Sequence, residues 1–168
     1  MIVWTSTFLF VDLCGYTEYT WRHGDARSAE LATGFHALVR NLAQGEGCEF
    51  VKAVGDGAMV RADECERAIV LAERLIASAA ELGYPPLRVG IDTGPAVARE
   101  GDWYGTTVNT AARVVDAAGP GEVLVTDRAR ESAVAGSIQT VASGAHSLKG
   151  LPECILHVAR SPAVELCA

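Results

Sequence analysis

The apolar positions of this chain alternate between short unbroken runs and stripes with helical spacing. Residues 5–13 form a nearly continuous run with many β-branched and aromatic side chains, which is typical of a central strand. Residues 26–43 carry large apolar side chains at steps of four, three and four, which places them on one face of a helix. These side chains are Leu31, Phe35, Leu38 and Leu42. The chain is therefore predicted to begin with a strand that is followed by a helix.

The same reasoning predicts further elements as far as residue 158. Asp56 lies between two glycines, a pattern that favours the tight turn of a hairpin, whereas Gly94 and Pro95 predict a break in a strand. The predicted strands are residues 49–54, 58–60, 87–91, 96–98, 123–125, 138–141 and 155–158, and the predicted helices are residues 68–82 and 107–118. This order predicts an α/β or α+β sandwich, in which one sheet has helices packed on one side.

Length and charge narrow the possible functions. The chain has 168 residues, of which 49% are apolar and 21% charged, so it can bury one sizeable core. We therefore expect a single domain over residues 1–168. The net charge of −7 argues against a general nucleic-acid surface, because a polyanion would be repelled by the average field of the protein.

Neither secretion nor membrane insertion is indicated by the sequence. The apolar start, residues 1–11, has no basic segment before it and is too short to span a bilayer. Because the first predicted strand begins almost at Met1, we expect no sensor domain before it. The cysteines lack the close spacing of zinc or redox sites, which favours reduced thiols and a cytoplasmic location. They are Cys14, Cys48, Cys65, Cys154 and Cys167.

Two carboxylates follow rigid elements and are candidates for metal binding. Asp12 lies where the first strand gives way to a glycine turn, and Asp56 lies at the tip of the predicted hairpin. Oxygen ligands on two rigid elements can share a pair of Mg²⁺ or Mn²⁺ ions, which also need phosphate oxygens and water. Either residue alone is also an ordinary turn residue.

The segment Gly15-Tyr16-Thr17 is a candidate anion site. Backbone N–H groups at a glycine turn that enters a helix can bind the β- and γ-phosphates of a nucleotide lying over Asp12.

Four further polar residues suit a nucleotide. Adenine has an acceptor at N1 and a donor at its N6 amino group, which Lys52 and Asp102 complement, whereas guanine reverses both polarities. Asn109 and Arg113 are four residues apart, so they share a helix face. Beside a pentavalent phosphorus, the arginine could neutralise developing charge and the asparagine could orient the ribose. Each of the four is commonplace when taken alone.

Three motifs in order give the chain a specific resemblance. They are Phe10-x-Asp12-x-x-Gly15-Tyr16-Thr17, Lys52-x-x-Gly55-Asp56-Gly57 and Asp102-x-x-Gly105-x-x-Val108-Asn109-x-Ala111-x-Arg113. With them the chain resembles the catalytic domain of class III adenylate and guanylate cyclases, from about residue 5 to residue 128. The resemblance implies a ferredoxin-like cyclase fold with a central, mostly antiparallel sheet flanked by helices. It also implies formation of 3′,5′-cyclic AMP and pyrophosphate from ATP.

The resemblance implies a role for each motif residue. Metal ligands would be Asp12, Leu13 and Asp56, which would hold two Mg²⁺ or Mn²⁺ ions in each site. The nucleotide would be bound by Lys52 and Asp102 at the base, by Gly15, Tyr16 and Thr17 at the phosphates, and by Asn109 and Arg113 at the ribose and α-phosphate. Lys149 lies where the family often has a phosphate-binding lysine.

The resemblance further implies a head-to-tail homodimer. Each active site would take its metal carboxylates from one chain and its base-reading and transition-state residues from the other. Only residues 96–101 separate Pro95 from Asp102, so the chain resembles a short-arm, stand-alone subgroup, with a smaller dimer contact expected.

Two other functions stay open at this point. A guanylate cyclase would use the same chemistry, although Lys52 and Asp102 have the wrong polarity for guanine. A catalytically silent nucleotide-binding or interaction module of the same fold is the alternative from another class, and the complete set of site residues disfavours it. A diguanylate cyclase is disfavoured because the hairpin lacks the Gly-Gly-acid-acid-Phe tip of that family.

Overall fold

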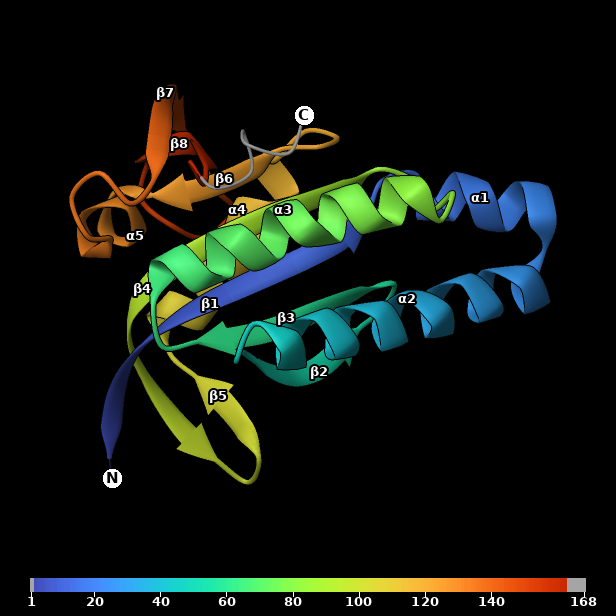
Figure 1. The fold of residues 1–168 in the computed structure, drawn as a ribbon, viewed down its shortest axis with the longest axis horizontal. Helices are drawn as coiled ribbons and strands as arrows, with labels where there is room; N and C mark the ends of the chain where they lie inside the picture. Colours follow the sequence, from blue (N-terminus) through green and yellow to red (C-terminus); the bar gives the residue numbers. More distant parts are fainter. Residues whose placement is uncertain (1, 163–168) are drawn as a thin grey trace.

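An eight-stranded sheet forms the centre of the protein in a computed structural model that describes residues 2–162 (Figure 1). The strands are β1 (Val3–Leu13), β2 (Glu49–Val54), β3 (Gly57–Ala62), β4 (Leu87–Arg99), β5 (Asp102–Tyr104), β6 (Val123–Thr126), β7 (Gln139–His146) and β8 (Cys154–Arg160). Their order is β2-β3-β1-β4-β6-β8-β7, and β5 pairs with β4. Every pairing is antiparallel except that of β4 with β6, which confirms the mostly antiparallel sheet.

Within residues 2–162, five helices flank the sheet and cover both of its faces. They are α1 (Tyr16–His23), α2 (Asp25–Gly45), α3 (Cys65–Glu81), α4 (Thr106–Ala117) and α5 (Asp127–Ser132). On the near face in Figure 1, Leu9 and Val11 of β1 share a core with Phe35 of α2 and Ile69 of α3. On the opposite face, a second cluster joins β1 and β3 to α4; it comprises Phe8, Phe10, Met59, Ala96, Val108, Ala111 and Val115. The expectation that helices pack on one side only is therefore wrong.

Strand β1 explains why the first apolar run is nearly continuous. Its side chains alternate between the two clusters, so both faces of the strand are covered and neither needs polar residues. The polar residues Ser6 and Thr7 are also buried, and Thr7 shares a hydrogen bond with Thr93 at 2.8 Å between hydroxyl oxygens.

Strand β4 continues through Gly94 and Pro95, where the sequence predicted a break. Pro95 pairs with Thr5 of β1 on one side. On the other side, β6 pairs with β4 only as far as Ile91, and β5 pairs only from Val97 onward. Proline is tolerated because no strand partner requires an N–H group on that side.

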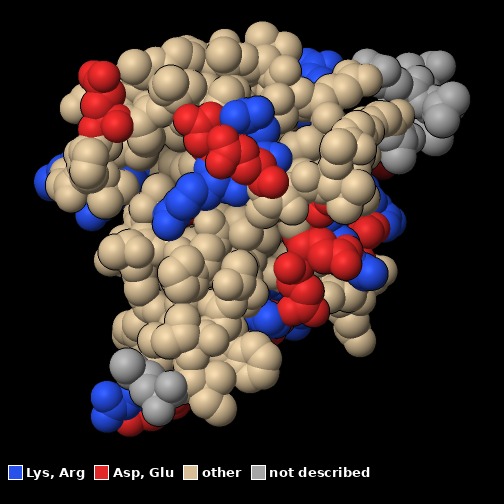
Figure 2. All heavy atoms as spheres, turned by 90° about the vertical axis from the view of Figure 1, so that its left-hand side faces the viewer, with Lys and Arg blue, Asp and Glu red and all other residues tan. Residues whose placement is uncertain are grey.

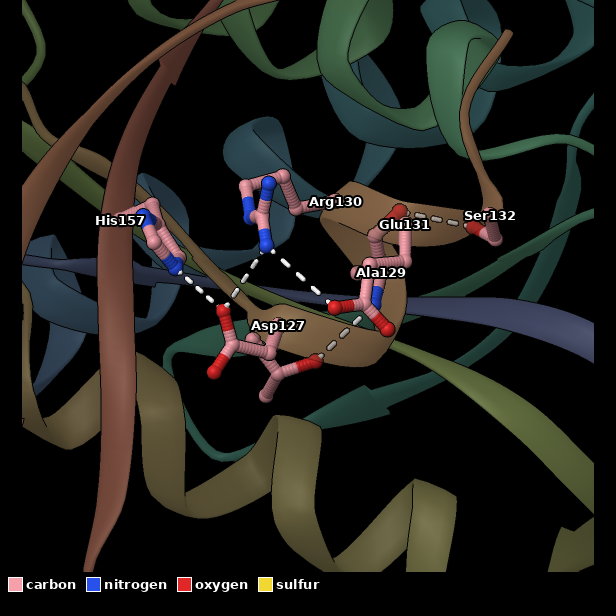
Figure 3. A network of polar contacts seen from close by, with 7 residues as sticks. Asp127, Ala129, Arg130, Glu131, Ser132 and His157 are labelled. Carbon is pink, nitrogen blue, oxygen red and sulfur yellow. Dashed lines mark hydrogen bonds and ion pairs between the residues drawn. The ribbon is translucent and has the colours of Figure 1, made fainter.

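Two helices were not predicted. Helix α1 has no buried residue, so it lacks the apolar stripe by which helices are recognised. Helix α5 has only six residues and is anchored by polar contacts instead, as Figure 3 shows. Thr126 caps it by accepting a hydrogen bond from the N–H of Ala129, and Nε2 of His157 on β8 lies 2.6 Å from Oδ1 of Asp127. Arg130 also contacts Asp127, at 3.3 Å.

Charged side chains of both signs are mixed on the surface. On the face shown in Figure 2, Lys and Arg side chains lie among Asp and Glu side chains in mixed clusters. Among residues 2–162, no helix is both long enough and apolar enough to cross a bilayer. Cys14, Cys48, Cys65 and Cys154 have free thiols, whereas Cys167 lies outside the described residues.

Helix α4 packs unusually close to β4 because Gly90 has no side chain. A Cβ atom at this position would lie less than 3.0 Å from backbone atoms of Val114 and Val115. The position of α4, and of Asn109 and Arg113 on it, therefore depends on this glycine.

We expect Gly90→Ala to destabilise the protein by about 2 kcal/mol or more, because backbone rather than a flexible side chain must move. The measurement is urea unfolding followed by circular dichroism. Gly45→Ala is the matched control, since a Cβ there meets nothing within 4 Å and the position is helical. That control should keep or slightly raise stability. Equal unfolding midpoints for Gly90→Ala and the unchanged protein would contradict the close approach.

Candidate functional site

The Asp12 and Asp56 side chains meet beside the end of β1. Asp12 shares the face of Phe8 and Phe10 by the alternation of the strand, and Asp56 lies in the two-residue turn between β2 and β3. A Cβ atom on Gly57 would lie less than 3.0 Å from the carbonyl oxygen of Val11, so glycine lets the hairpin pack against β1. The two carboxyl groups are consequently within hydrogen-bonding distance.

Their proximity changes the acidity of Asp56. Burial raises the pKa of Asp56 from 3.8 to about 6, and the negative charge of Asp12 adds to the effect. Two half-buried carboxylates that repel one another suit a divalent cation, which would remove the repulsion. In the described part of the chain, no three His, Cys, Asp or Glu side chains gather as a metal cluster. Additional ligands would therefore be backbone, water or substrate oxygens. Leu13 fits only through its backbone carbonyl, because its side chain carries no ligand atom.

Arg88 joins this pair, and the sequence analysis missed it. The residue lies directly opposite Asp12 in the pairing of β1 with β4. Its Nε and Nη2 atoms donate to Oδ2 of Asp12 at 3.1 and 2.6 Å. The sequence did contain a signal: Arg88 is the one charged residue in the predicted strand 87–91, whose other residues are apolar or glycine.

Gly15, Tyr16 and Thr17 form the predicted turn into a helix. Gly15 has φ 74 and precedes α1, whose first backbone hydrogen bond runs from the N–H of Tyr19 to the Gly15 carbonyl at 2.9 Å. The N–H groups of residues 16–18 are thus at the helix terminus, where a ligand can accept from them. The Tyr16 hydroxyl donates to the carbonyl of Ser28 at 2.8 Å, so this side chain ties α1 to α2.

Lys52 and Asp102 form an ion pair, although 50 residues separate them. The pairing of β2 with β3 shifts register between Phe50 and Lys52, so that Val51 is the extra residue of a bulge. Phe50 then packs on the α2 side while Val51 packs on the α4 side. Lys52 pairs with Met59, which belongs to the α4 side, and so reaches Asp102 on β5. The hydrogen bond from Lys52 lowers the pKa of Asp102 below its ordinary value.

Asn109, Arg113 and Lys149 line one pocket of about 380 Å³, together with Ala112, Gly150 and Leu151. The first two are exposed on consecutive turns of α4, as their spacing predicted, and the lysine lies between β7 and β8. The structure therefore brings Lys149 beside two residues of α4 that lie far from it in the sequence.

The site residues of one chain form three groups, which are the Asp12–Asp56 pair with Arg88, the Lys52–Asp102 pair, and the pocket that contains Arg113. Asp116 of α4 lies between two of these groups, with Oδ1 3.6 Å from Arg88 and Oδ2 3.9 Å from Arg113. Within residues 2–162, no hydrogen bond or ion pair links Lys52 or Asp102 to the Asp12–Asp56 pair. All three groups lie on or beside the α4 face of the sheet.

Comparisons with known proteins show what the sequence and the fold of this chain resemble. Residues 5–160 match the model of the family described as adenylate and guanylate cyclase catalytic domain. A pH-sensitive adenylate cyclase of Mycobacterium tuberculosis is 36% identical over 131 residues, which cover 75% of this chain and 32% of that protein. An adenylate cyclase of Streptomyces griseus is 38% identical over 117 residues, covering 69% and 29% respectively. The chain thus spans about a third of the length of these relatives.

Solved structures show the same fold at low identity. The adenylyl cyclase CyaB from P. aeruginosa superposes with a TM-score of 0.82 at 19% identity, covering 95% of this chain and 96% of that one. The guanylate cyclase domain of RhGC from Catenaria anguillulae, solved with GTP, gives 0.84 at 21% identity, covering 96% and 99%. At such identities the likeness concerns the fold alone.

Proposed function

Since the chain belongs to the family of class III adenylate and guanylate cyclase catalytic domains, we propose that it converts ATP to 3′,5′-cyclic AMP and pyrophosphate. The observation that carries the choice of ATP is the ion pair of Lys52 with Asp102. The Lys52 ammonium group donates to adenine N1, and the Asp102 carboxylate accepts from the N6 amino group. Guanine has a donor at N1 and an acceptor at O6, so both contacts would be unfavourable.

Asp12, Asp56 and the Leu13 backbone would hold two Mg²⁺ or Mn²⁺ ions. This proposal is supported by the contact between the two carboxyl groups and by the raised pKa of Asp56. Bound there, the ions supply a lowered pKa for the ribose 3′-hydroxyl and neutralisation of triphosphate charge. Arg88 lies beside the same carboxylates and adds a positive charge next to the triphosphate.

The other residues bind and orient the nucleotide. Backbone N–H groups of residues 15–17 bind the terminal phosphates. Asn109 orients the ribose so that its 3′-oxygen lies in line with the α-phosphorus, while Arg113 and Lys149 neutralise charge on the phosphate oxygens. The 3′-oxygen forms a bond to the α-phosphorus as the bond to the bridging oxygen breaks, and pyrophosphate leaves. The hydroxyl proton passes to water, so no side-chain base is needed.

A homodimer with two shared sites is part of the proposal. Among residues 2–162, no hydrogen bond or ion pair links the base-reading pair to the metal carboxylates, which supports a site completed by a second copy. Residues 1–168 would act as a single catalytic domain, and the arm is short because only Glu100 and Gly101 join β4 to β5. The free thiols support a cytoplasmic location.

The test is incubation of the purified protein with ATP and with GTP, each with Mg²⁺ and with Mn²⁺, followed by identification of the products. We expect cyclic AMP and pyrophosphate from ATP, and a lower kcat/KM with GTP. Faster turnover of GTP would make the protein a guanylate cyclase. Absence of pyrophosphate release from either nucleotide would make it a silent module.

A pH-dependent stabilisation by Mn²⁺ is expected from the Asp12–Asp56 pair. A carboxyl whose pKa is higher in the folded than in the unfolded protein costs stability as it ionises, here between about pH 4 and about pH 6. Mn²⁺ relieves this cost only where Asp56 is ionised. The rise in Tm caused by Mn²⁺ should therefore be larger one unit above the Asp56 pKa of about 6 than one unit below it. Asp56→Asn should show only a small rise in Tm at both pH values. If Mn²⁺ raises the Tm of the unchanged protein equally at the two pH values, the assignment is contradicted.

A further inference from the structure

Trp103 lies between two side chains of the neighbouring strands. Its ring centroid is 5.6 Å from that of Phe8, with the planes inclined by 60°. The Cζ atom of Arg61 lies 4.8 Å from the centroid of the Trp103 ring. Phe8 and Arg61 are paired in the register of β1 with β3, so their side chains stand together under the indole. Trp103 thereby anchors β5, which pairs through only three residues of β4.

Arg61 is held at all edges of its guanidinium group. Nε donates to the hydroxyl of fully buried Ser6 at 2.9 Å, and Nη2 donates to Oδ1 of Asp63 at 2.5 Å. Nη1 lies 3.6 Å from Glu49. The guanidinium is consequently fixed in one orientation, in which its Cζ atom lies over the indole ring.

This clamp lies directly beside the base-reading pair. The backbone N–H of Trp103 donates to Oδ1 of Asp102 at 2.8 Å, while Oδ2 of the same carboxylate pairs with Lys52. Val51, the bulge residue before Lys52, packs against the same cluster as Trp103. Asp102 is therefore bound to the backbone of Trp103, and Lys52 follows a residue that packs on the same cluster.

We propose that Trp103, clamped between Phe8 and Arg61, is a positioning residue that holds Asp102 against Lys52 and thereby determines the preference for adenine over guanine. The inference rests on the proposed function for its substrate, although Trp103 itself touches no reacting atom. A carboxylate displaced by an ångström makes a weaker hydrogen bond to the N6 amino group, so the difference in binding energy between adenine and guanine falls. Misplacement on this scale costs up to about a hundredfold in rate.

The experiment compares Trp103→Ala, Trp103→Phe, Arg61→Lys and the unchanged protein. We expect Trp103→Ala to raise the KM for ATP roughly tenfold and to lower the ATP:GTP ratio of kcat/KM by a similar factor. Trp103→Phe keeps a ring between Phe8 and Arg61 and should retain most of the ratio. Arg61→Lys keeps the charge but loses the flat face, so its ratio should fall. Trp21→Ala and Arg67→Lys alter the same residue types at exposed helical positions and should leave the ratio unchanged.

Partial unfolding gives a different result from misplacement of Asp102. Loss of folded protein lowers the apparent kcat and leaves both KM and the ATP:GTP ratio as they were. A Trp103→Ala protein with an unchanged ratio would therefore overturn the inference, while the proposed activity would stand.

A binding measurement separates this inference from the cyclase activity. The 3′-deoxy forms of ATP and GTP lack the attacking hydroxyl, so calorimetry with them reports base preference without turnover. If the unchanged protein makes no cyclic nucleotide, the proposed function fails, and the inference is still decided by these ligands. A preference for 3′-deoxy-ATP that Trp103→Ala abolishes supports it, and a preference that survives, or no preference in the unchanged protein, overturns it.

Discussion

Replacement of Asp12 by alanine is expected to abolish cyclic AMP formation, lowering kcat by about a thousandfold or more with Mn²⁺ and ATP. The loss lies at the upper end of what one charge-stabilising group contributes, because Asp12 would take part in holding both ions. The substitution also leaves Arg88 without the carboxylate that now accepts two of its hydrogen bonds. The measurement is the rate of cyclic AMP formation over a range of Mn²⁺ concentrations.

A control must account for the lost ion pair. Asp127→Ala removes a carboxylate that is paired in the same way, with His157 and Arg130, at a place outside the proposed site (Figure 3). Asp127→Ala should therefore keep most of the activity, and circular dichroism should show both variants folded. Turnover of folded Asp12→Ala at the rate of the unchanged protein would rule out metal binding at this carboxylate.

Two inactive variants are expected to restore activity when they are mixed. Asp12→Ala damages the metal half of a site and Arg113→Ala damages the transition-state half. In a symmetric dimer with shared sites, a heterodimer has one site with both defects and one site that is intact. Random association of equal amounts makes about half of the dimers mixed, so about a quarter of the original activity should return. The measurement is cyclic AMP formation by each variant alone and by the mixture.

The control for this recovery is a mixture of Asp12→Ala with Asp56→Ala. Both substitutions damage the metal half, so a heterodimer of these two chains has no intact site and the mixture should stay inactive. No recovery in the first mixture, when mass spectrometry shows heterodimers, would mean that sites are not shared between chains. Recovery in this control would mean that Asp12 and Asp56 do not belong to the same half of a site.

Elements that carry their own apolar pattern could be predicted from the sequence. The run at residues 5–13 corresponds to β1 because this strand is buried on both faces, and the stripe at residues 26–43 corresponds to α2. The Gly-Asp-Gly turn was predictable because its backbone requirements are local. Helices α1 and α5 were missed because contacts with other segments, rather than a local stripe, hold them.

Only those features of the site that depend on residue type and on spacing within one segment could be predicted. The four-residue spacing from Asn109 to Arg113 defines a shared helix face, but the distance of Lys149 from them depends on the packing of β7 and β8. The Lys52 side chain points toward Asp102 because of a bulge at Val51, and no residue type at this place predicts a bulge. These features arise from tertiary structure, and periodicity within one segment does not contain them.

The two acidic halves of the proposed site differ in how firmly the backbone holds them. Asp12 lies near the end of an 11-residue strand that is paired with β4 along its whole length and with β3 over residues 7–11, whereas Asp102 begins a strand of three residues paired on one side. Amide protons of β1 should therefore exchange with deuterium at the rate set by global unfolding, and those of β5 through small local openings. Adenine binding would slow exchange in β5 and leave β1 almost unaffected. Binding of the base would thus order the less stable half of the site, while the metal carboxylates lie on a part of the sheet that is already rigid.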